Sequence, residues 1–187
     1  MLISEQNSSA AHLNRAHTAP ESIASGWWRQ LWALLLLLAV FGAQAQTGVV
    51  SRVIDGDTIW IKTAPGRKPL KVRIAGIDAP EICQSGGLAS RDALRRRLLG
   101  QTVTMIQTSY RRHDDYGRLL ASIDLKGEDV GRWMVSSGYA WSYHFRRNPG
   151  PYAAEQGRAK AAGRGLFAQT APENPRQFRQ QHGSCHP

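Results

Sequence analysis

The sequence is short of acidic side chains. Its 187 residues hold 14 aspartates and glutamates against 24 lysines and arginines, which gives a formal net charge of +10. This imbalance favours an anionic partner: nucleic acid, an acidic membrane surface or an acidic polymer. Charge alone does not identify which of these partners is bound. It also does not exclude a basic surface that binds no particular partner.

Cysteine is nearly absent as well. The two cysteines, Cys83 and Cys185, form no regularly spaced set with the six histidines, which argues against a zinc site. A bridge between them would tie the end of the chain to its middle. Two separate thiols remain the alternative, because sequence does not show whether two residues are close in space.

The chain has no internal repeat and only one long apolar run, at residues 31–41. A run of about a dozen residues is short for a membrane span but typical of a secretory signal. Ala43 and Ala45 follow it, and they supply the small residues that a signal peptidase recognises at its cleavage site. We therefore predict a signal peptide or an uncleaved N-terminal signal anchor over residues 1–45, and a secreted or periplasmic protein.

The remaining residues are enough for one domain with a proper core. We place this domain at residues 46–170. Residues 171–187 form a tail rich in proline, glutamine and arginine, which we expect to be loosely ordered.

The pattern of the domain predicts five strands and about three helices. Runs rich in β-branched residues predict strands at 49–54, 58–61, 70–74, 101–108 and 117–125. Helices are expected at 88–99, after a cap at Asp129, and at 151–162. A helix between the third and fourth strands is the element order of an α+β five-stranded OB-fold β-barrel, whose concave face commonly binds oligonucleotides.

Charged side chains gather at the predicted strand ends. Asp57 follows the first turn, Arg73 lies on the third strand, and Arg118 opens the fifth. Asp78 and Glu81 lie in the loop that leaves the third strand. Because a barrel brings neighbouring strand ends together, we expect these five side chains to share one cleft mouth.

This set fits phosphodiester hydrolysis. Two aspartates supply hard oxygen ligands for Ca²⁺, and a glutamate can orient water or accept its proton. Guanidinium groups can bind phosphate oxygens as charge develops on them. Among the nearby aromatic residues, Tyr116, Trp141 and Tyr143 could stack on bases.

Each feature has a plainer interpretation when it stands alone. Asp55-Gly56 is a common hairpin turn, and Arg73 could point outward from a half-buried strand. The segment around Pro80 could be a surface loop with no part in binding or catalysis. The order and spacing of the features together carry the prediction.

Three segments resemble the staphylococcal nuclease (thermonuclease) family: residues 53–58, 72–81 and 115–121. The resemblance extends over about residues 47–170. It implies an OB-fold enzyme that cuts DNA and RNA with little sequence preference.

The resemblance also implies roles for individual residues. Asp57 and Asp78 match calcium ligands, and Ala79 matches a position whose backbone carbonyl faces the calcium. The phosphate-binding arginines are matched by Arg73 and Arg118. Glu81 matches the general base. The family's tyrosines that stack on nucleotide are not cleanly matched in this sequence, and Tyr143 and His144 are the candidates for that place. We expect Tyr116, which lies near the site, to bind substrate with them.

Two further departures from the family affect substrate affinity and base preference. Residues 82–87 replace a long basic loop, and Asp115 stands where a lysine is expected. A catalytically silent nucleic-acid-binding module and an envelope protein that docks on anionic lipid are the alternatives to a nuclease. The retained carboxylates favour the nuclease, because they repel phosphate unless a cation intervenes. No stable protein partner is implied, a monomer is expected, and contact with a membrane is expected only if the N-terminal segment stays uncleaved.

Overall fold

A computed structural model describes residues 45–107, 113–144 and 147–185. The predicted signal segment therefore lies outside the described residues, apart from its last position. Within the described ranges, no helix has both the length and the apolar character needed to cross a membrane.

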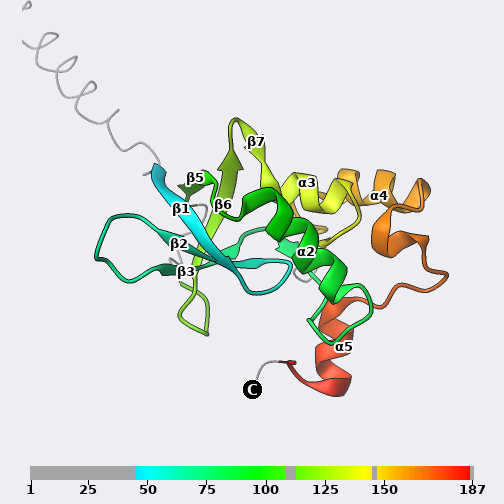
Figure 1. Cartoon of the computed structure of the whole chain (residues 1–187). Helices are drawn as coiled ribbons and strands as arrows, with labels where there is room; N and C mark the ends of the chain where they lie inside the picture. Colours follow the sequence, from blue (N-terminus) through cyan, green and yellow to red (C-terminus); the bar gives the residue numbers. More distant parts are fainter. Residues whose placement is uncertain (1–44, 108–112, 145–146, 186–187) are drawn as a thin grey trace, which may run out of the picture. The chain divides into compact units, whose positions relative to one another are not determined.

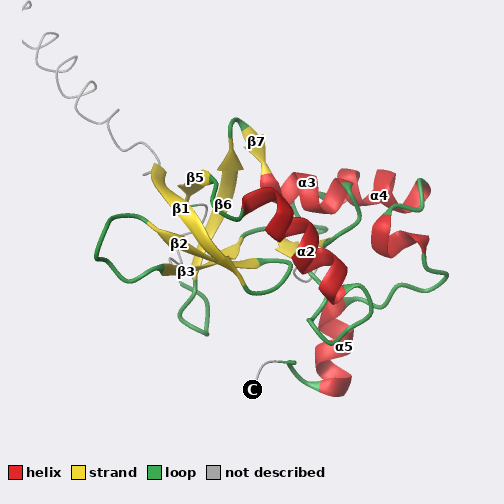
Figure 2. Ribbon diagram, in the orientation of Figure 1, coloured by secondary structure: helices red, strands yellow, loops and turns green. Residues whose placement is uncertain are grey.

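Five strands close into a barrel, as the sequence predicts (Figure 2). The third and the fifth barrel strands pair in parallel, and this pairing closes an otherwise antiparallel sheet. The barrel strands are β1 (Ala45–Val53), β2 (Thr58–Lys62), β3 (Leu70–Ile74), β5 (Thr102–Ile106) and β6 (Leu119–Leu125).

The long strand β1 takes part in both halves of the barrel. It pairs with β5 from Ala45 to Val49 and with β2 from Val49 to Val53. Its register with β2 shifts between Val50 and Arg52, so one extra residue is inserted there. Such a bulge bends a strand and increases its twist, which allows a sheet of few strands to close.

Helices cover one side of the barrel strands and continue beyond them (Figure 1). The three expected helices are present as α2 (Gly87–Leu98), α3 (Val130–Ser136) and α4 (Ala153–Ala161). Asp129 caps α3 as predicted, because its side chain accepts a hydrogen bond from the backbone N–H of Arg132 at 3.1 Å. A short 3-10 helix, η1 (Gly165–Ala168), follows α4.

The expectation of a loosely ordered tail is wrong for residues 175–182, which form helix α5 (Pro175–His182). Asn174 caps this helix, and a proline occupies its first turn, where the missing N–H costs nothing. The tail composition obscured this ordinary helix start, which the Asn-Pro step signals.

Two short pairings were not predicted. Strand β4 (Ile77–Asp78) pairs with β8 (Trp141–Ser142), and β7 (Glu128–Asp129) extends the sheet beside β6. Two-residue strands are too short to produce an alternating hydrophobic pattern, so sequence gives no signal for them. The β4–β8 pairing nevertheless fixes the backbone that carries Asp78.

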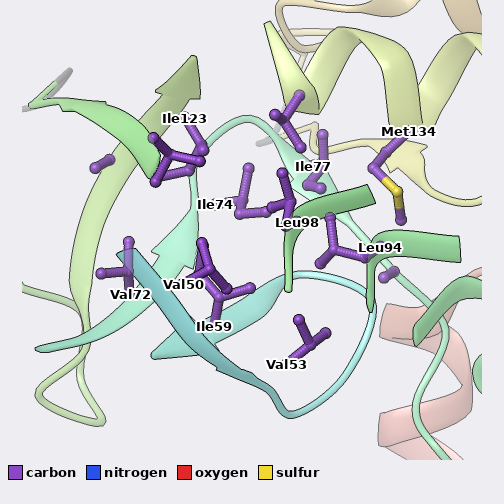
Figure 3. Close-up of a cluster of buried hydrophobic side chains, with 14 of the residues drawn as sticks. Val50, Val53, Ile59, Val72, Ile74, Ile77, Leu94, Leu98, Ile123 and Met134 are labelled. Atoms are coloured by element: carbon purple, nitrogen blue, oxygen red, sulfur yellow. The ribbon is translucent and has the colours of Figure 1, made fainter. Parts of the chain in front are cut away.

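The core fills the space between the barrel and α2. Figure 3 shows Leu94 and Leu98 pointing from α2 toward strand side chains that include Ile74. These side chains are completely buried, and Met134 of α3 extends the same cluster. Arg91 and Arg95 lie at less buried positions of α2, and only Leu94 and Leu98 among its leucines face the barrel.

Replacing Leu94 by alanine should lower the free energy of unfolding by about 2–5 kcal/mol, because the site is sealed on all sides. Leu88→Ala on the same helix is the matched control, since Leu88 is 54% exposed. The control should change stability by no more than about 0.5 kcal/mol. Urea denaturation of both variants measures the difference, and equal losses would contradict the packing described here.

The two cysteines form a disulfide, Cys83–Cys185, with their Cα atoms 5.8 Å apart. The structure thereby decides between the two alternatives that the sequence left open. A second link lies beside it, where the Gln84 side chain donates a hydrogen bond to the backbone carbonyl of Glu173 at 2.9 Å. Both links hold the segment around α5 against the loop that precedes α2 (Figure 1).

Candidate active site

A pocket of about 740 Å³ opens at the end of the barrel where the predicted site residues meet. Four of the five charged side chains named from the sequence line it. The fifth, Asp78, is not among the lining residues but contacts two of the lining arginines. The lining includes Asp57, Arg73, Ala79, Glu81, Arg118 and Arg179.

Strand pairing explains why these residues meet. Thr58 pairs with Arg73 across β2 and β3, so Asp57 and Arg73 face the same end of the barrel. The backbone N–H of Ile74 donates to the carbonyl of Asp57 at 2.8 Å and closes this end of the ladder. From β3 the chain turns directly into β4, which carries Asp78.

The carboxylate of Asp57 is buried and held on both oxygens. Its Oδ1 lies 3.2 Å from Arg73 Nε and accepts a hydrogen bond from the Thr58 hydroxyl at 3.0 Å. The backbone N–H of Ala79 donates to its Oδ2 at 3.1 Å. The β1–β2 turn is thus locked to the loop that follows β4.

Arg73 joins the two aspartates. Its Nη2 lies 3.4 Å from Asp78 Oδ1, while its Nε contacts Asp57. Its Nη1 donates to the backbone carbonyls of Ile74 and Ile77, both at 2.9 Å. One guanidinium therefore touches both carboxylates, so these carboxylates converge, and Arg73 does not point outward from its strand.

Burial raises the pKa of Asp78, and the bonds from Arg179 and the charge of Arg73 offset this only in part. Burial and the neighbouring charge of Asp57 raise the pKa of Asp55 to about 6. The pocket therefore concentrates carboxylates in surroundings where an additional cation would stabilise their ionised forms.

The donor chemistry fits a hard divalent cation. Two buried carboxylates that converge on one cationic group are the oxygen ligands that Ca²⁺ prefers, with water completing its sphere. The described residues contain no cluster of three or more His, Cys, Asp or Glu side chains arranged to hold a metal. A site here would consequently rest on Asp57, Asp78 and non-carboxylate oxygens such as the Ala79 carbonyl.

The sequence did not identify Asp114 as part of the site, although it orients Arg118. Arg118 Nε lies 2.6 Å from Asp114 Oδ2, and Arg118 Nη1 donates to the Thr58 hydroxyl at 3.1 Å. Burial raises the pKa of Asp114, but its bonds from the backbone and side chain of Arg118 outweigh burial and lower it overall. The pair is lost only at acidic pH, as the pH falls through this lowered pKa, and is intact at neutral pH.

Asp114→Asn should slow phosphodiester cleavage, the activity that the sequence predicts, about tenfold by loosening Arg118, because the charge-assisted bond to Nε is lost. The asparagine keeps an acceptor for the N–H groups of Tyr116 and Arg118, so the loop should retain its shape. Single-turnover rates measure the effect. An unchanged rate would show that Asp114 does not position Arg118.

Glu81 begins the loop before α2, and its side chain is largely buried. Its backbone N–H donates to the Gln84 side chain at 3.1 Å, which fixes the loop locally. Its carboxylate Oε1 accepts from Arg179 Nη1 at 3.0 Å. Sequence reasoning missed Arg179, because it lies in the tail that was expected to be loosely ordered.

Of the four aromatic candidates, two line the pocket and two do not. Tyr116 and Tyr143 line the pocket and are exposed, with Arg118 lying 5.2 Å from the ring centre of Tyr116. His144 instead lies at a much smaller hollow beside Asp78. Trp141 packs edge-on against Phe167 at 5.0 Å and is absent from the pocket wall, so it does not serve as a stacking platform there.

Comparison with known proteins gives the same family that the motifs indicate. A family model described as staphylococcal nuclease homologue matches residues 71–169. This segment holds Arg73, Asp78, Glu81 and Arg118, whereas Asp57 precedes it and α5 follows it.

Individual relatives agree with the family match. An uncharacterized endonuclease of Haemophilus influenzae is 34% identical over 154 residues, which cover 81% of this chain and 84% of the relative. An uncharacterized endonuclease of Escherichia coli is 36% identical over 129 residues, 68% of this chain and 81% of the relative. A micrococcal nuclease of Shigella flexneri is 32% identical over 126 residues, 63% of this chain and 70% of the relative. The chain belongs to the staphylococcal nuclease family and is a nuclease.

Proposed function

We propose that this nuclease is an exported, calcium-dependent enzyme that hydrolyses phosphodiester bonds of DNA, RNA or both with little sequence specificity. The observation that carries the proposal is an open pocket lined by a buried aspartate, a glutamate and two arginines, with a second buried aspartate, Asp78, paired to one of these arginines. A pure binding surface gains nothing from carboxylates that face a polyanion.

Each charged residue has a distinct task in this proposal. Asp57, Asp78 and the carbonyl of Ala79 would hold the calcium ion, which supplies charge neutralisation at the phosphate and helps to orient water. Glu81 accepts the proton of the attacking water, or orders that water for attack. Arg73 and Arg118 bind phosphate oxygens and stabilise the charge that grows on them in the transition state.

Low sequence specificity follows from what the pocket offers a substrate. Its cations address the phosphate, which is the same in every nucleotide. Tyr116 and Tyr143 offer ring faces for stacking, and stacking tolerates all bases. The family match supports nucleic acid as the substrate.

Two observations support export. The apolar run at residues 31–41 has the length of a secretory signal. The Cys83–Cys185 disulfide suits an oxidising compartment such as the periplasm or the extracellular medium, because cytosolic thiols stay reduced.

The test is hydrolysis of single-stranded DNA and of RNA by the purified protein, first with calcium and then with excess chelator. We expect cleavage that stops when the chelator is added. Binding without cleavage in calcium would instead indicate a catalytically silent nucleic-acid-binding module. Cleavage that survives the chelator would leave a nuclease without the proposed metal.

A further inference from the structure

Arg179 brings a third guanidinium into the site from outside the segment that matches the family. It lies on α5, beyond residue 169, where the family match ends. Its Nη1 donates to Asp78 Oδ1 at 3.2 Å and to Glu81 Oε1 at 3.0 Å, and its Nη2 donates to Asp78 Oδ2 at 3.0 Å. Both oxygens of Asp78 are therefore engaged by one arginine.

Covalent and hydrogen-bonded links hold the helix that carries Arg179 beside the site. The Cys83–Cys185 disulfide joins the loop just after Glu81 to the residues just after α5. On the other side of α5, the Gln84 side chain bonds to the backbone carbonyl of Glu173 at 2.9 Å. The loop that carries Glu81 is thus fastened to the chain at both ends of the helix that carries Arg179.

The position of Arg179 matters for any cation that enters the site. A guanidinium that bonds to both oxygens of Asp78 engages the same two atoms that a divalent cation would use as ligands. Two cations on one carboxylate also repel each other, most strongly where water is partly excluded. Since the Arg179 side chain is 33% exposed and lines the pocket, it has open space into which it can withdraw.

We propose that Arg179 is a further functional residue of this nuclease: a resident cation that competes with the divalent metal for Asp78 and so sets the metal affinity of the site. The disulfide keeps it in place. This inference rests on the proposed calcium site. It predicts that calcium binds more weakly to the native protein than to a protein without the arginine.

The test is calorimetric titration of the purified full chain with calcium alone, without nucleic acid. Arg179→Gln should bind calcium about tenfold more tightly, because a positive charge at the ligand is removed while solvent screens part of its effect. Arg96→Gln is the matched control, since it removes the same charge from an exposed position on α2 that does not line the pocket. The control should leave calcium affinity unchanged.

A double variant, Cys83→Ser with Cys185→Ser, tests the tether separately. It keeps Arg179 but frees the end of α5, so we expect a smaller gain in affinity, about threefold. Thermal melting of each variant checks that the barrel stays folded. A merely structural Arg179 would lower the melting temperature without tightening calcium binding.

Equal or weaker calcium binding by Arg179→Gln would overturn the competition, whatever the nuclease assay shows. If neither the native protein nor this variant binds calcium, the inference fails together with the metal assignment. Tighter calcium binding by the variant, together with no cleavage by the native protein in calcium, would support the competition and count against the proposed function alone. The titration together with the cleavage assay of the native protein therefore distinguishes a failure of the competition from a failure of the proposed function.

Discussion

Glu81→Gln is expected to reduce the cleavage rate by about 10²–10⁴-fold, the range by which a general base accelerates proton transfer. Glutamine has nearly the same shape but cannot take up the proton of the attacking water. The side chain would still accept a hydrogen bond from Arg179, so the pocket should keep its form. Single-turnover cleavage in saturating calcium measures the loss.

Nucleic-acid affinity separates this explanation from a loss of binding. The dissociation constant of the variant should stay within a few-fold of the native value, because phosphate binding is assigned to the arginines. Glu128→Gln is the control, since Glu128 lies on β7 and does not line the pocket. A variant at Glu81 with native turnover would end the assignment of this residue as base or water-orienting group.

Arg118→Ala is expected to lower the rate by about 10²–10³-fold, with a much smaller change in substrate affinity. Asp114 and Thr58 hold its guanidinium at the pocket wall, so it is positioned before the substrate arrives. A donor placed in advance acts most strongly where charge develops during the reaction. Measuring kcat and KM on single-stranded DNA shows how much of the effect falls on the rate and how much on substrate affinity.

Arg118→Lys gives a matched comparison, because lysine keeps the charge and loses the two-pronged geometry. It should recover part of the rate and most of the affinity. Equal losses of affinity and rate in the alanine variant would instead indicate an arginine that only binds the substrate.

The barrel could be predicted from the sequence because its strands carry their own signals. The run at residues 58–61 and the run at 70–74 became β2 and β3 with almost unchanged limits. Turn residues such as Asp55-Gly56 marked where one strand ends and the next begins. The order of the strands predicts a closed barrel, and a closed barrel brings Asp57 close to Arg73, as the structure shows.

Other parts of the site depend on tertiary contacts that leave no local pattern. Asp114 matters because Arg118 folds back onto it, and a polar loop sequence looks the same without this contact. Arg179 matters because a disulfide and Gln84 bring α5 to the pocket. The tail is rich in proline, glutamine and arginine, so its composition did not suggest helix α5 despite the Asn-Pro helix start. Nothing in the local sequence shows that α5 reaches the pocket.

The most direct test of the account is the calcium dependence of single-stranded DNA cleavage for the native protein and for Asp57→Asn. The substitution keeps the shape of a buried side chain and removes one of the two charges assigned to the metal. We predict that native cleavage rises to saturation with calcium. The variant should need at least about tenfold more calcium or lose activity altogether. Superimposable calcium curves would contradict a metal site at Asp57 and Asp78.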